Sequence, residues 1–430
     1  MKRRDFLAAA SLSALGVSAA TRAAMAQNGA GVRLVIAGAG AAGLSLASRF
    51  SNALNNAQII IVDERKSHVF QPGLTLVGAG LWPMQKVLDQ NADYIPNGVE
   101  WVQEAVAEFE PDANQIITAG ARQIKYDFLF VATGLALDYA AIDGMDTALI
   151  GQKGVASVYA GPEAAAASAK AIDAYIDQGG VGLFGRPATE MKCAGAPLKM
   201  TFITDDKARI NGRREGLELI YNAHNNGVFA VAPVNEKVTS LFEARDVKVN
   251  YNHVLQALDT DRKVARFSTP NGSVSLDYDF IHVVPPMRAP QAVRNSPLPW
   301  QSGPLSNDGW IEANKENLRH PRYANVFSIG DVAGVPRGKT AASVKWQVPV
   351  VVDHVLAELA NKESTAAYNG YTSCPLITRY GKAMLIEFDY DGKLVPSFPF
   401  IEPLDELWVS WLIDEKILHG TYRAMLQGHA

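Results

Sequence analysis

The chain has 430 residues, with 40 lysines and arginines against 44 aspartates and glutamates, which gives a formal net charge of −4. This mild acidity, without a cluster of basic residues, argues against nucleic acid as a partner. The length suffices for two or three domains with a substantial core. No run of about 18 apolar residues follows the first 26, so we expect no membrane-spanning segment beyond them.

The first 26 residues have the pattern of an export signal. Arg3 and Arg4 precede an Ala/Leu-rich stretch, and Ala24-Met25-Ala26 offers a small-residue cleavage site. A charged start, an apolar middle too short to cross a bilayer and such a site are typical of a signal peptide. The arginine pair followed by Phe6-Leu7 resembles a twin-arginine signal. We therefore expect export of the folded protein to the periplasm, where a cysteine pair can persist as a disulfide.

The next segment carries a dinucleotide-binding fingerprint. An apolar strand is expected at residues 32–37, a glycine-rich turn at 38–43 and a helix from there to about residue 54. A second apolar run ends on an acid 20 residues after the last glycine. The glycines permit a tight turn and close backbone approach, the helix N-terminus faces the pyrophosphate, and the acid binds a ribose hydroxyl. The residues expected to bind the dinucleotide are Gly38, Gly40, Ala42, Gly43 and Asp63.

Two further strand ends indicate that the dinucleotide is FAD. One strand ends in Ala132-Thr133-Gly134 and another, near the other end of the chain, in Gly330-Asp331. Both resemble the flavoprotein disulfide-reductase superfamily, in which the Gly-Asp acid holds the FAD ribitol. A helix expected to begin near Lys339-Thr340 would direct its positive end at the flavin. Lys339 would add charge that stabilises the anionic reduced flavin.

The middle of the chain, residues 151–290, is expected to form a second Rossmann-like domain that interrupts the FAD domain. Its first strand is followed by Arg186-Pro187, where a phosphate-binding turn needs small residues. Proline also lacks a backbone N–H that such a turn might use. We therefore expect no nicotinamide dinucleotide here. The strand leads instead to Cys193.

The chain has two cysteines, Cys193 and Cys374, which lie 181 residues apart in loops that contain glycine or proline. They could be two unrelated buried thiols, because free cysteine often packs as a small apolar residue. They could equally be a redox pair that only the fold brings together. The helix expected after Gly43 holds no cysteine, which excludes a disulfide reductase with its cysteine pair in that helix. The FAD motifs favour the redox pair.

With these motifs in place, the chain resembles the sulfide:quinone oxidoreductases, and specifically the branch that includes the mitochondrial enzyme. The resemblance covers nearly the whole chain after residue 26, and the two cysteine loops are its most specific parts. The chain departs from the family pattern in its twin-arginine signal and in the short tail after Phe400. The matching segments are residues 70–80, 191–197, 282–287, 371–376, 387–390 and 398–400.

The resemblance implies an enzyme that oxidises sulfide and passes two electrons through FAD to a membrane quinone. Cys193 and Cys374 would be bridged by a disulfide or a trisulfide. Attack by hydrosulfide would leave a persulfide on Cys374 and a thiolate on Cys193, which faces the flavin. The sulfane sulfur would go to a thiol or sulfite acceptor. We expect noncovalent FAD, because no third cysteine is available, and no metal, because no cluster has metal-ligand spacing.

The tail after Phe400 has an amphipathic pattern. Trp408, Trp411 and Leu412 would share one face of a helix. This pattern is typical of a helix at a membrane interface, with aromatic side chains at headgroup level. A helix packed on the protein's own core is the alternative. Because a quinone resides in the bilayer, the resemblance favours peripheral attachment to the inner membrane.

Positive charge near the cysteines is expected mainly from Lys339. Lys192 and Lys199 also lie near the cysteine loops in sequence, but we expect each to be a solvated surface charge. His282 lies in a family-like stretch, where a core histidine with satisfied hydrogen bonds is the simpler interpretation.

The predicted fold is therefore α/β, with two Rossmann-like domains and a small C-terminal region that carries the interfacial helix. Three other functions stay open. They are the flavoprotein subunit of a flavocytochrome c sulfide dehydrogenase, an NADH:quinone oxidoreductase of the same fold, and a non-catalytic periplasmic flavin redox sensor. The expected segments are the signal 1–26, the FAD domain 27–150 and 291–365, the second domain 151–290, and the C-terminal region 366–430.

Overall fold

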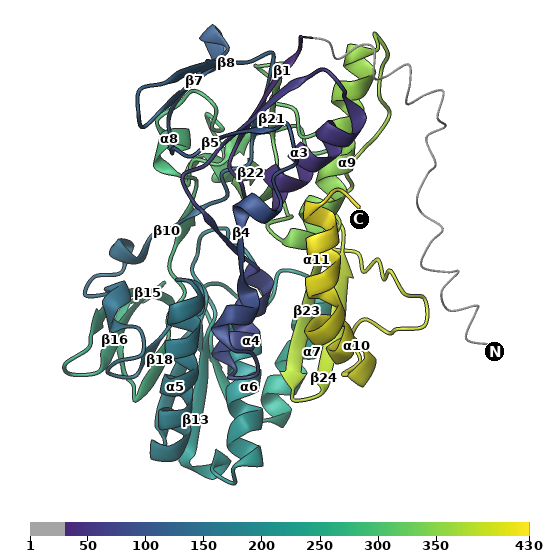
Figure 1. The fold of residues 1–430 in the computed structure, drawn as a ribbon. Coiled ribbons are helices and arrows are strands. Elements are labelled where there is room, and N and C mark those ends of the chain that lie inside the picture. The colour runs from purple at the N-terminus through teal and green to yellow at the C-terminus, as the bar shows by residue number, and fades with distance from the viewer. Residues whose placement is uncertain (1–30, 430) are drawn as a thin grey trace.

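A computed structural model describes residues 31–429, so the expected signal segment, 1–26, lies outside the described residues. The chain forms two five-stranded parallel sheets, which confirms the predicted α/β fold. In Figure 1 the first sheet lies in the upper part of the molecule and the second in the lower part. A C-terminal hairpin and helices, drawn in yellow and yellow-green, run along one side of both.

The first sheet has the strand order β21-β9-β1-β2-β5, with every neighbouring pair parallel. Its central strands are short apolar runs buried on both faces, as parallel sheets require. Ala37 is level with Val62 and Val131, so three strands end together at one edge. The elements are β1 (Arg33–Ala37), α3 (Ala41–Ala53), β2 (Gln58–Val62), β5 (Glu100–Val102), β9 (Phe128–Val131), β21 (Val326–Ser328) and α9 (Ala341–Leu359).

The second sheet has the order β11-β18-β12-β13-β14, again with parallel neighbours throughout. The chain leaves the first sheet through β10 (Ala136–Leu137) and returns through β19 (Met287–Arg288), and these two strands pair antiparallel. The two crossings therefore lie side by side. The elements are β11 (Val155–Ala156), α5 (Pro162–Gln178), β12 (Gly180–Gly185), α6 (Ala196–Ile210), β13 (Leu217–Asn222), α7 (Ala232–Ala244), β14 (Val247–Asn250) and β18 (Phe280–His282).

The C-terminal region is a hairpin followed by a helical segment that returns to the first sheet's layer. Ser48 on α3 donates a 2.7 Å hydrogen bond to the carbonyl of Leu426, and the ring of His68 lies 2.7 Å from the Tyr422 hydroxyl. The tail is thus anchored to the first domain. Its elements are β23 (Thr372–Arg379), β24 (Lys382–Phe388), α10 (Trp408–Leu412), a π-helical turn (Ile413–Ile417) and α11 (Leu418–Leu426).

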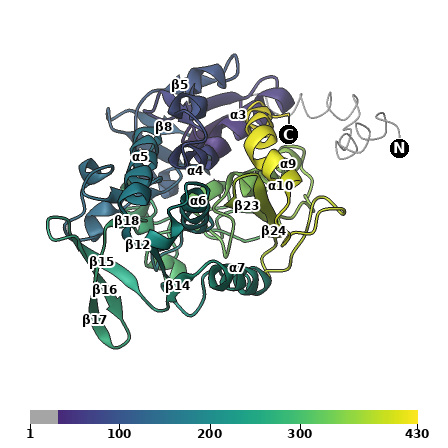
Figure 2. The same ribbon diagram turned by 90° about the horizontal axis from the view of Figure 1, so that it is seen from below.

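The remaining elements are small sheets and short helices. Seen from below in Figure 2, β15–β17 project on the side away from the C-terminal helices. Within residues 31–429, none of the helices is both long enough and apolar enough to cross a bilayer. The small elements are β3 (Ser67–Val69), α4 (Leu74–Gly78), β4 (Leu88–Gln90), β6 (Val106–Glu110), β7 (Gln115–Thr118), β8 (Gln123–Lys125), β15 (Val254–Asp259), β16 (Val264–Thr269), β17 (Gly272–Asp277), α8 (Gln291–Arg294), β20 (Ile311–Glu312) and β22 (Ala333–Gly334).

Candidate active site

The fold brings the two cysteines together. Cys193 lies near the end of the loop after β12, three residues before the start of α6, and has a φ of 48°, in the left-handed region that few non-glycine residues adopt. Gly195 lies against Cys374, because a Cβ at that glycine would collide with the Cys374 sulfur. The two thiols lie close enough for each to shift the pKa of the other. Residues 181 positions apart therefore form one site.

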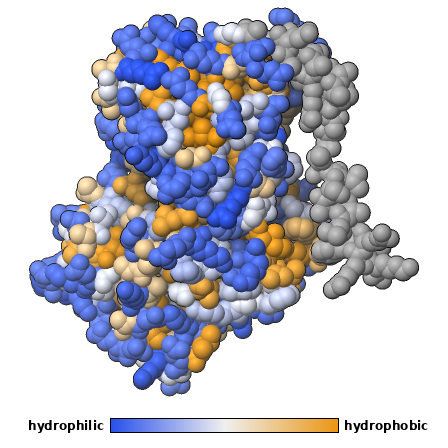
Figure 3. Space-filling view, in the orientation of Figure 1, coloured by the Kyte–Doolittle hydropathy of each residue, from blue (hydrophilic) through white to orange (hydrophobic). Residues whose placement is uncertain are grey.

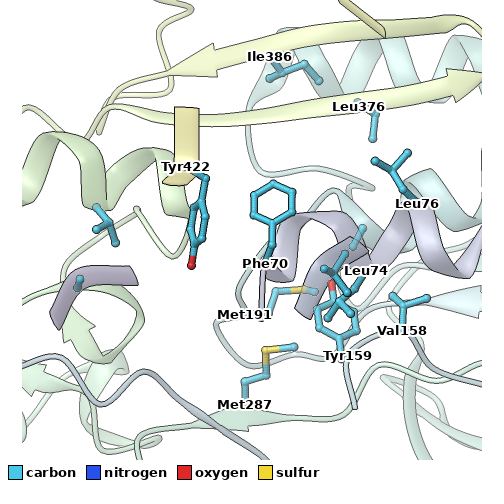
Figure 4. Packing of buried hydrophobic residues seen from close by; sticks show 14 of the residues in the cluster. Phe70, Leu74, Leu76, Val158, Tyr159, Met191, Met287, Leu376, Ile386 and Tyr422 are labelled. Carbon is cyan, nitrogen blue, oxygen red and sulfur yellow. The ribbon is translucent and has the colours of Figure 1, made fainter. Parts of the chain in front are cut away.

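The Cys193 loop is fixed by backbone hydrogen bonds to both domains. The Cys193 N–H donates to the carbonyl of Lys339 at 3.2 Å, and its carbonyl accepts from the Tyr159 hydroxyl at 3.0 Å. Figure 4 shows Tyr159 and Met191 within one apolar cluster that also takes in Phe70. The loop is thus held against the segment that leads into α9, on the side of the first domain.

Cys374 is fixed by its place in the hairpin. It lies within β23 opposite Ile386 and is 5 % exposed, so the expectation that this cysteine lies in a loop was wrong. Two residues earlier, the Thr372 hydroxyl lies 2.8 Å from that of Thr340, which caps the N-terminus of α9 by accepting from the Ser343 N–H. The strand that carries Cys374 is therefore tied to the same helix terminus as the Cys193 loop.

Lys199 is the buried cation beside the thiols, and the expectation of a solvated surface charge was wrong. It lies on α6 and is 3 % exposed. Burial opposes its charge, but the carboxylate of Asp414 and the two thiols raise its pKa above the ordinary value. Asp414 comes from the π-helical turn of the tail and is itself buried, which raises its own pKa.

Lys339 does not supply the charge beside the thiols, in contrast to the sequence-based expectation. Its Nζ donates to the carbonyls of Asp331 at 2.7 Å and Ala333 at 3.1 Å and lies 3.6 Å from the centre of the Trp310 ring. Burial lowers its pKa to about 8. Its side chain therefore binds carbonyl groups of the segment that directly follows β21. Lys192 is directed to Gln71, whose side-chain oxygen it contacts at 2.7 Å.

The environment separates the ionisation of the two cysteines. The hydrogen bond with Cys374 lowers the pKa of Cys193 despite burial, and Lys199 lowers it further. The same hydrogen bond and burial raise the pKa of Cys374. Cys193 also precedes α6, whose N-terminus favours a nearby negative charge. Cys193 is therefore the better thiolate and Cys374 the better thiol.

The glycine-rich turn after β1 has the form of a dinucleotide cradle. Gly38 has a φ of 114°, and a Cβ on Gly43 would collide with the Gly38 carbonyl. A Cβ on Gly40, in contrast, would meet nothing within 4 Å, so the backbone is open to a ligand there. Ala42 lies beside the Gly330 segment, because a Cβ on Gly330 would be 3.5 Å from that of Ala42.

Asp63 directly follows β2 and faces the turn. Its carboxylate accepts from the Ala39 N–H at 2.6 Å and from Arg65, whose guanidinium lies 2.6 Å away. Burial opposes ionisation, but these hydrogen bonds outweigh it and lower the pKa of Asp63. The carboxylate is therefore charged and held in one orientation next to the cradle. Arg65 was not predicted from the sequence.

The other predicted strand ends meet at the same edge of the sheet. Gly134 and Gly330 have φ values of 71° and 76°, and a Cβ on Gly134 would meet nothing within 4 Å. The Thr133 hydroxyl is buried without a hydrogen-bond partner. Burial raises the pKa of Asp331, although the nearby Lys192 and Lys339 oppose the shift. An open backbone and an unsatisfied hydroxyl fit a bound polar ligand at this edge.

His282 is not a satisfied core histidine, so that interpretation was wrong. It is 2 % exposed, and neither ring nitrogen has a hydrogen-bond partner. Burial lowers its pKa to about 4, so the ring is neutral at ordinary pH.

The sequence holds only weak indications that Lys199 and Asp414 are buried. Lys199 stands within the apolar stretch Ala196–Ile203, and a lysine inside such a run on a helix indicates a buried cation that needs a partner. Asp414 likewise follows Ile413 in an apolar tail. Nothing in the sequence could have paired Lys199 with Asp414 across more than 200 residues.

Comparisons with known proteins show the family to which the chain belongs. A family model described as pyridine nucleotide-disulphide oxidoreductase matches residues 32–170. The mitochondrial sulfide:quinone oxidoreductase of Dictyostelium discoideum is 34% identical over 397 residues, which cover 92% of this chain and 86% of that protein. The enzyme of the same name from Mus musculus is 32% identical over 399 residues, which cover 92% of this chain and 86% of that protein.

A solved structure shows the same fold. The sulfide:quinone oxidoreductase of Aquifex aeolicus superposes with a TM-score of 0.76, covering 92% of each chain at 16% identity. The structural match and the sequence match to the mitochondrial enzymes therefore each cover 92% of this chain. The chain belongs to the sulfide:quinone oxidoreductase family of oxidoreductases.

Proposed function

We propose that this protein oxidises sulfide through Cys193 and Cys374 and transfers the electrons through FAD to a quinone. The observation that carries the proposal is the meeting of the two thiols at the N-terminus of α6, with the Cys193 backbone bonded to the segment that leads into α9. The family's named activity supports the choice of substrates.

The residues at the edge of the first sheet fit FAD. The open backbone at Gly40 would receive the pyrophosphate, and Asp63 would bind the adenosine ribose. Thr133, Gly134, Gly330, Asp331 and Thr340 would line the remainder of the site. When bound, FAD supplies a two-electron acceptor. We propose noncovalent binding, which predicts that acid precipitation releases all flavin from the polypeptide.

The different pKa values of the two cysteines determine which one leaves as a thiolate and which one carries the persulfide. In the oxidised pair, hydrosulfide attacks the Cys374 sulfur, the bond to Cys193 breaks, and its electron pair leaves on Cys193. A thiolate of lower pKa leaves faster, and Cys193 has the lowered pKa. The persulfide therefore remains on Cys374, while the Cys193 thiolate lies on the side of the first domain.

A disulfide or a trisulfide, which holds one more sulfur, joins the two cysteines in the oxidised form. A trisulfide would exceed a disulfide by the mass of one sulfur atom, so intact-protein mass spectrometry of the oxidised enzyme separates the two forms. The persulfide sulfur on Cys374 passes to a thiol or to sulfite. Turnover with each acceptor, followed by assay of the sulfur product, identifies which one is used.

The C-terminal apolar patch, defined as Phe398, Phe400, Trp408, Val409 and Ile417, supports membrane attachment. Its side chains are 37–69% exposed, and Figure 3 shows apolar residues gathered over the region of α10 on this face. Trp411 does not share this exposure, because it packs against Tyr380. Aromatic residues at such density are typical of helices that lie at a bilayer surface. We propose that this patch gives access to the quinone.

The proposed location is the periplasmic face of the inner membrane, reached by the twin-arginine route. Its support is the sequence of residues 1–26, outside the described part of the chain. Replacing Arg3 and Arg4 by lysine should keep the protein in the cytoplasm, and unchanged export would contradict this route.

Anaerobic titration tests the whole proposal. Sulfide should bleach the flavin absorbance of the purified holoenzyme with a stoichiometry set by the cysteine pair and flavin, and a short-chain ubiquinone should restore it. Failure of sulfide to reduce the flavin would overturn the proposal and favour a redox sensor. Reoxidation by cytochrome c but not by quinone would favour a flavocytochrome subunit, and bleaching by NADH would favour an NADH:quinone oxidoreductase.

A further inference from the structure

The second sheet carries a cavity that the sulfide chemistry does not use. It opens at the carboxyl ends of β12, β13 and β18, beneath β15 and β16, and encloses about 30 Å³. Its lining combines apolar walls with Arg186, Asn222, His253 and His282. This is space for about two water molecules, so the cavity suits one small ion rather than a dinucleotide.

The cavity lies where parallel sheets bind ligands. In the order β11-β18-β12-β13-β14, the chain runs from β12 to β13 on one side, whereas β18 flanks β12 on the other. The crevice outside the carboxyl ends of strands at such a reversal is the general ligand position of open α/β sheets. Arg186 and His282 directly follow or end two of these strands.

Two lining side chains have unused hydrogen-bonding capacity. Both ring nitrogens of the buried His282 lack a partner. The Nε of Arg186 is also buried without an acceptor, and no hydrogen bond or ion pair joins this arginine to any other residue within 31–429. Buried polar groups in proteins are nearly always paired, so these groups indicate a ligand.

The lining decides the class of ligand. Pro187 removes a backbone N–H at the start of the loop, and α6 begins only at Ala196, so β12 does not lead directly into a helix N-terminus that could hold a pyrophosphate. A guanidinium offers a planar fork of donors to an oxyanion, and a neutral imidazole adds one more donor. We propose that this cavity binds one small oxyanion of the size of sulfite, sulfate or phosphate, held by Arg186 and His282.

Arg186 of the proposed anion site and the redox cysteine Cys193 lie on the same loop. Arg186 starts the loop that holds Cys193 near its end, and it lies near enough to Tyr159 to act on its pKa. The Tyr159 hydroxyl donates to the Cys193 carbonyl. An anion on Arg186 therefore binds at one end of a loop whose other end carries the thiol. Binding itself does not depend on the proposed sulfide activity.

Isothermal titration calorimetry of the holoenzyme at constant ionic strength tests the site. Sulfite, sulfate and phosphate are titrated separately, and at least one should bind saturably with one site per chain. Arg186→Gln should weaken that binding by about tenfold or more, as expected for loss of a charged hydrogen bond. Arg186→Lys, which keeps the charge but loses the fork, should weaken it less.

Arg213→Gln is the matched control, because Arg213 is exposed in the same domain. It should bind the anion as the unaltered protein does, and melting curves without anion should show that all three variants are folded. Absence of saturable binding, or equal affinity of the Arg186→Gln and Arg213→Gln variants, would overturn the proposal. So would tighter binding of NADH that displaces the anion, since this would assign the cavity to a nucleotide.

Discussion

The first turns of the two parallel sheets show how one architecture serves two chemistries. Each turn follows a central strand, β1 or β12, and leads into a helix that packs on the sheet. Three residues, Gly38–Gly40, separate β1 from α3, whereas ten residues, 186–195, separate β12 from α6. The short turn suits the proposed FAD, because a helix N-terminus directly after a strand can face a ligand phosphate. The long loop instead places a thiol at the helix N-terminus.

The side chains reinforce this difference in length. The first turn depends on missing side chains, because a Cβ on Gly38 or Gly43 would collide with backbone. The second places Arg186 and Pro187 at its start and Cys193, in a left-handed conformation, near its end. The length of the loop after the central strand and a few of its residues therefore determine what the loop binds, whereas the topology of the sheet does not.

The largest expected effect on activity comes from removing either thiol of the pair, Cys193 in the loop after β12 or Cys374 on β23. Cys193→Ser and Cys374→Ser should each lower the rate of sulfide-dependent flavin reduction by about three orders of magnitude or more, since each removes one half of a unit that acts together. Stopped-flow absorbance measures this rate. Flavin content should stay unchanged, because neither cysteine belongs to the first turn. A variant that retains turnover would refute the paired mechanism.

The first turn can be broken in two distinguishable ways. Gly43→Ala should lower the free energy of unfolding by about 1–3 kcal/mol even without flavin, because its Cβ meets the Gly38 carbonyl. Gly40→Ala should leave the apoprotein's melting temperature unchanged, because its Cβ meets no protein atom, yet weaken flavin binding. Thermal melting of apoprotein and flavin titration separate the two effects. Equal flavin affinity in Gly40→Ala would contradict the cradle.

Removing the charge of Lys199, beside the two thiols, should shift the pH dependence of the sulfide-dependent rate. Lys199 lowers the pKa of Cys193, so Lys199→Met should raise that pKa and move the acid limb of the sulfide-dependent rate to higher pH, by about one unit or more. Asp414 opposes the lowering, so Asp414→Asn should move the limb to lower pH. Lys207→Met, on the same helix but paired with Asp173, is the control and should leave the limb in place.

A smaller effect concerns the C-terminal apolar patch, which neither turn contains. Trp408→Asp should weaken binding to liposomes by about tenfold, because an exposed aromatic anchor becomes a charge. Val274→Asp, at an exposed apolar position on β17 away from the tail, should bind as the unaltered protein does. Cosedimentation measures both. Equal loss in the two variants would show a general charge effect rather than a membrane-facing patch.

The smallest effect lies at the ribose end of the first turn. Arg65→Ala should lower the free energy of unfolding by no more than about 1 kcal/mol at neutral pH, because the Arg65 side chain is 53% exposed. Asp63 has a lowered pKa in the folded chain, so this contribution is present above the ordinary aspartate pKa and fades as pH falls through the lowered value. Urea melts across this range test it. A loss that persists at the lowest pH would exclude the ion pair as its cause.

Much of the fold could be predicted because local patterns specify it. The apolar runs that became β1, β9 and β12 each precede a turn whose glycines or proline mark the strand end, and the run that became β2 is followed by Asp63. Those runs need no knowledge of distant residues. The short antiparallel connection of β10 with β19 was not predicted, since two-residue strands leave no periodic pattern.

The candidate site was only partly predictable, because its charges depend on tertiary contacts. The cysteines and glycines were recognised from motifs, whereas the burial of Lys199 depends on α6 packing against the hairpin and the tail. The assignment of charge to Lys339 failed because its side chain turns to carbonyls of its own segment and to Trp310. Sequence proximity to a thiol does not determine side-chain direction.

The separation of the two cysteines along the chain has a thermodynamic consequence. A bond between Cys193 and Cys374 would close a loop of about 181 residues, and the chain-entropy model assigns such a cross-link about 5 kcal/mol through the unfolded state. In that model the oxidised enzyme would resist unfolding more strongly than the reduced one. Each turnover would then alternate the protein between the more stable oxidised form and the less stable reduced form, which sulfide produces.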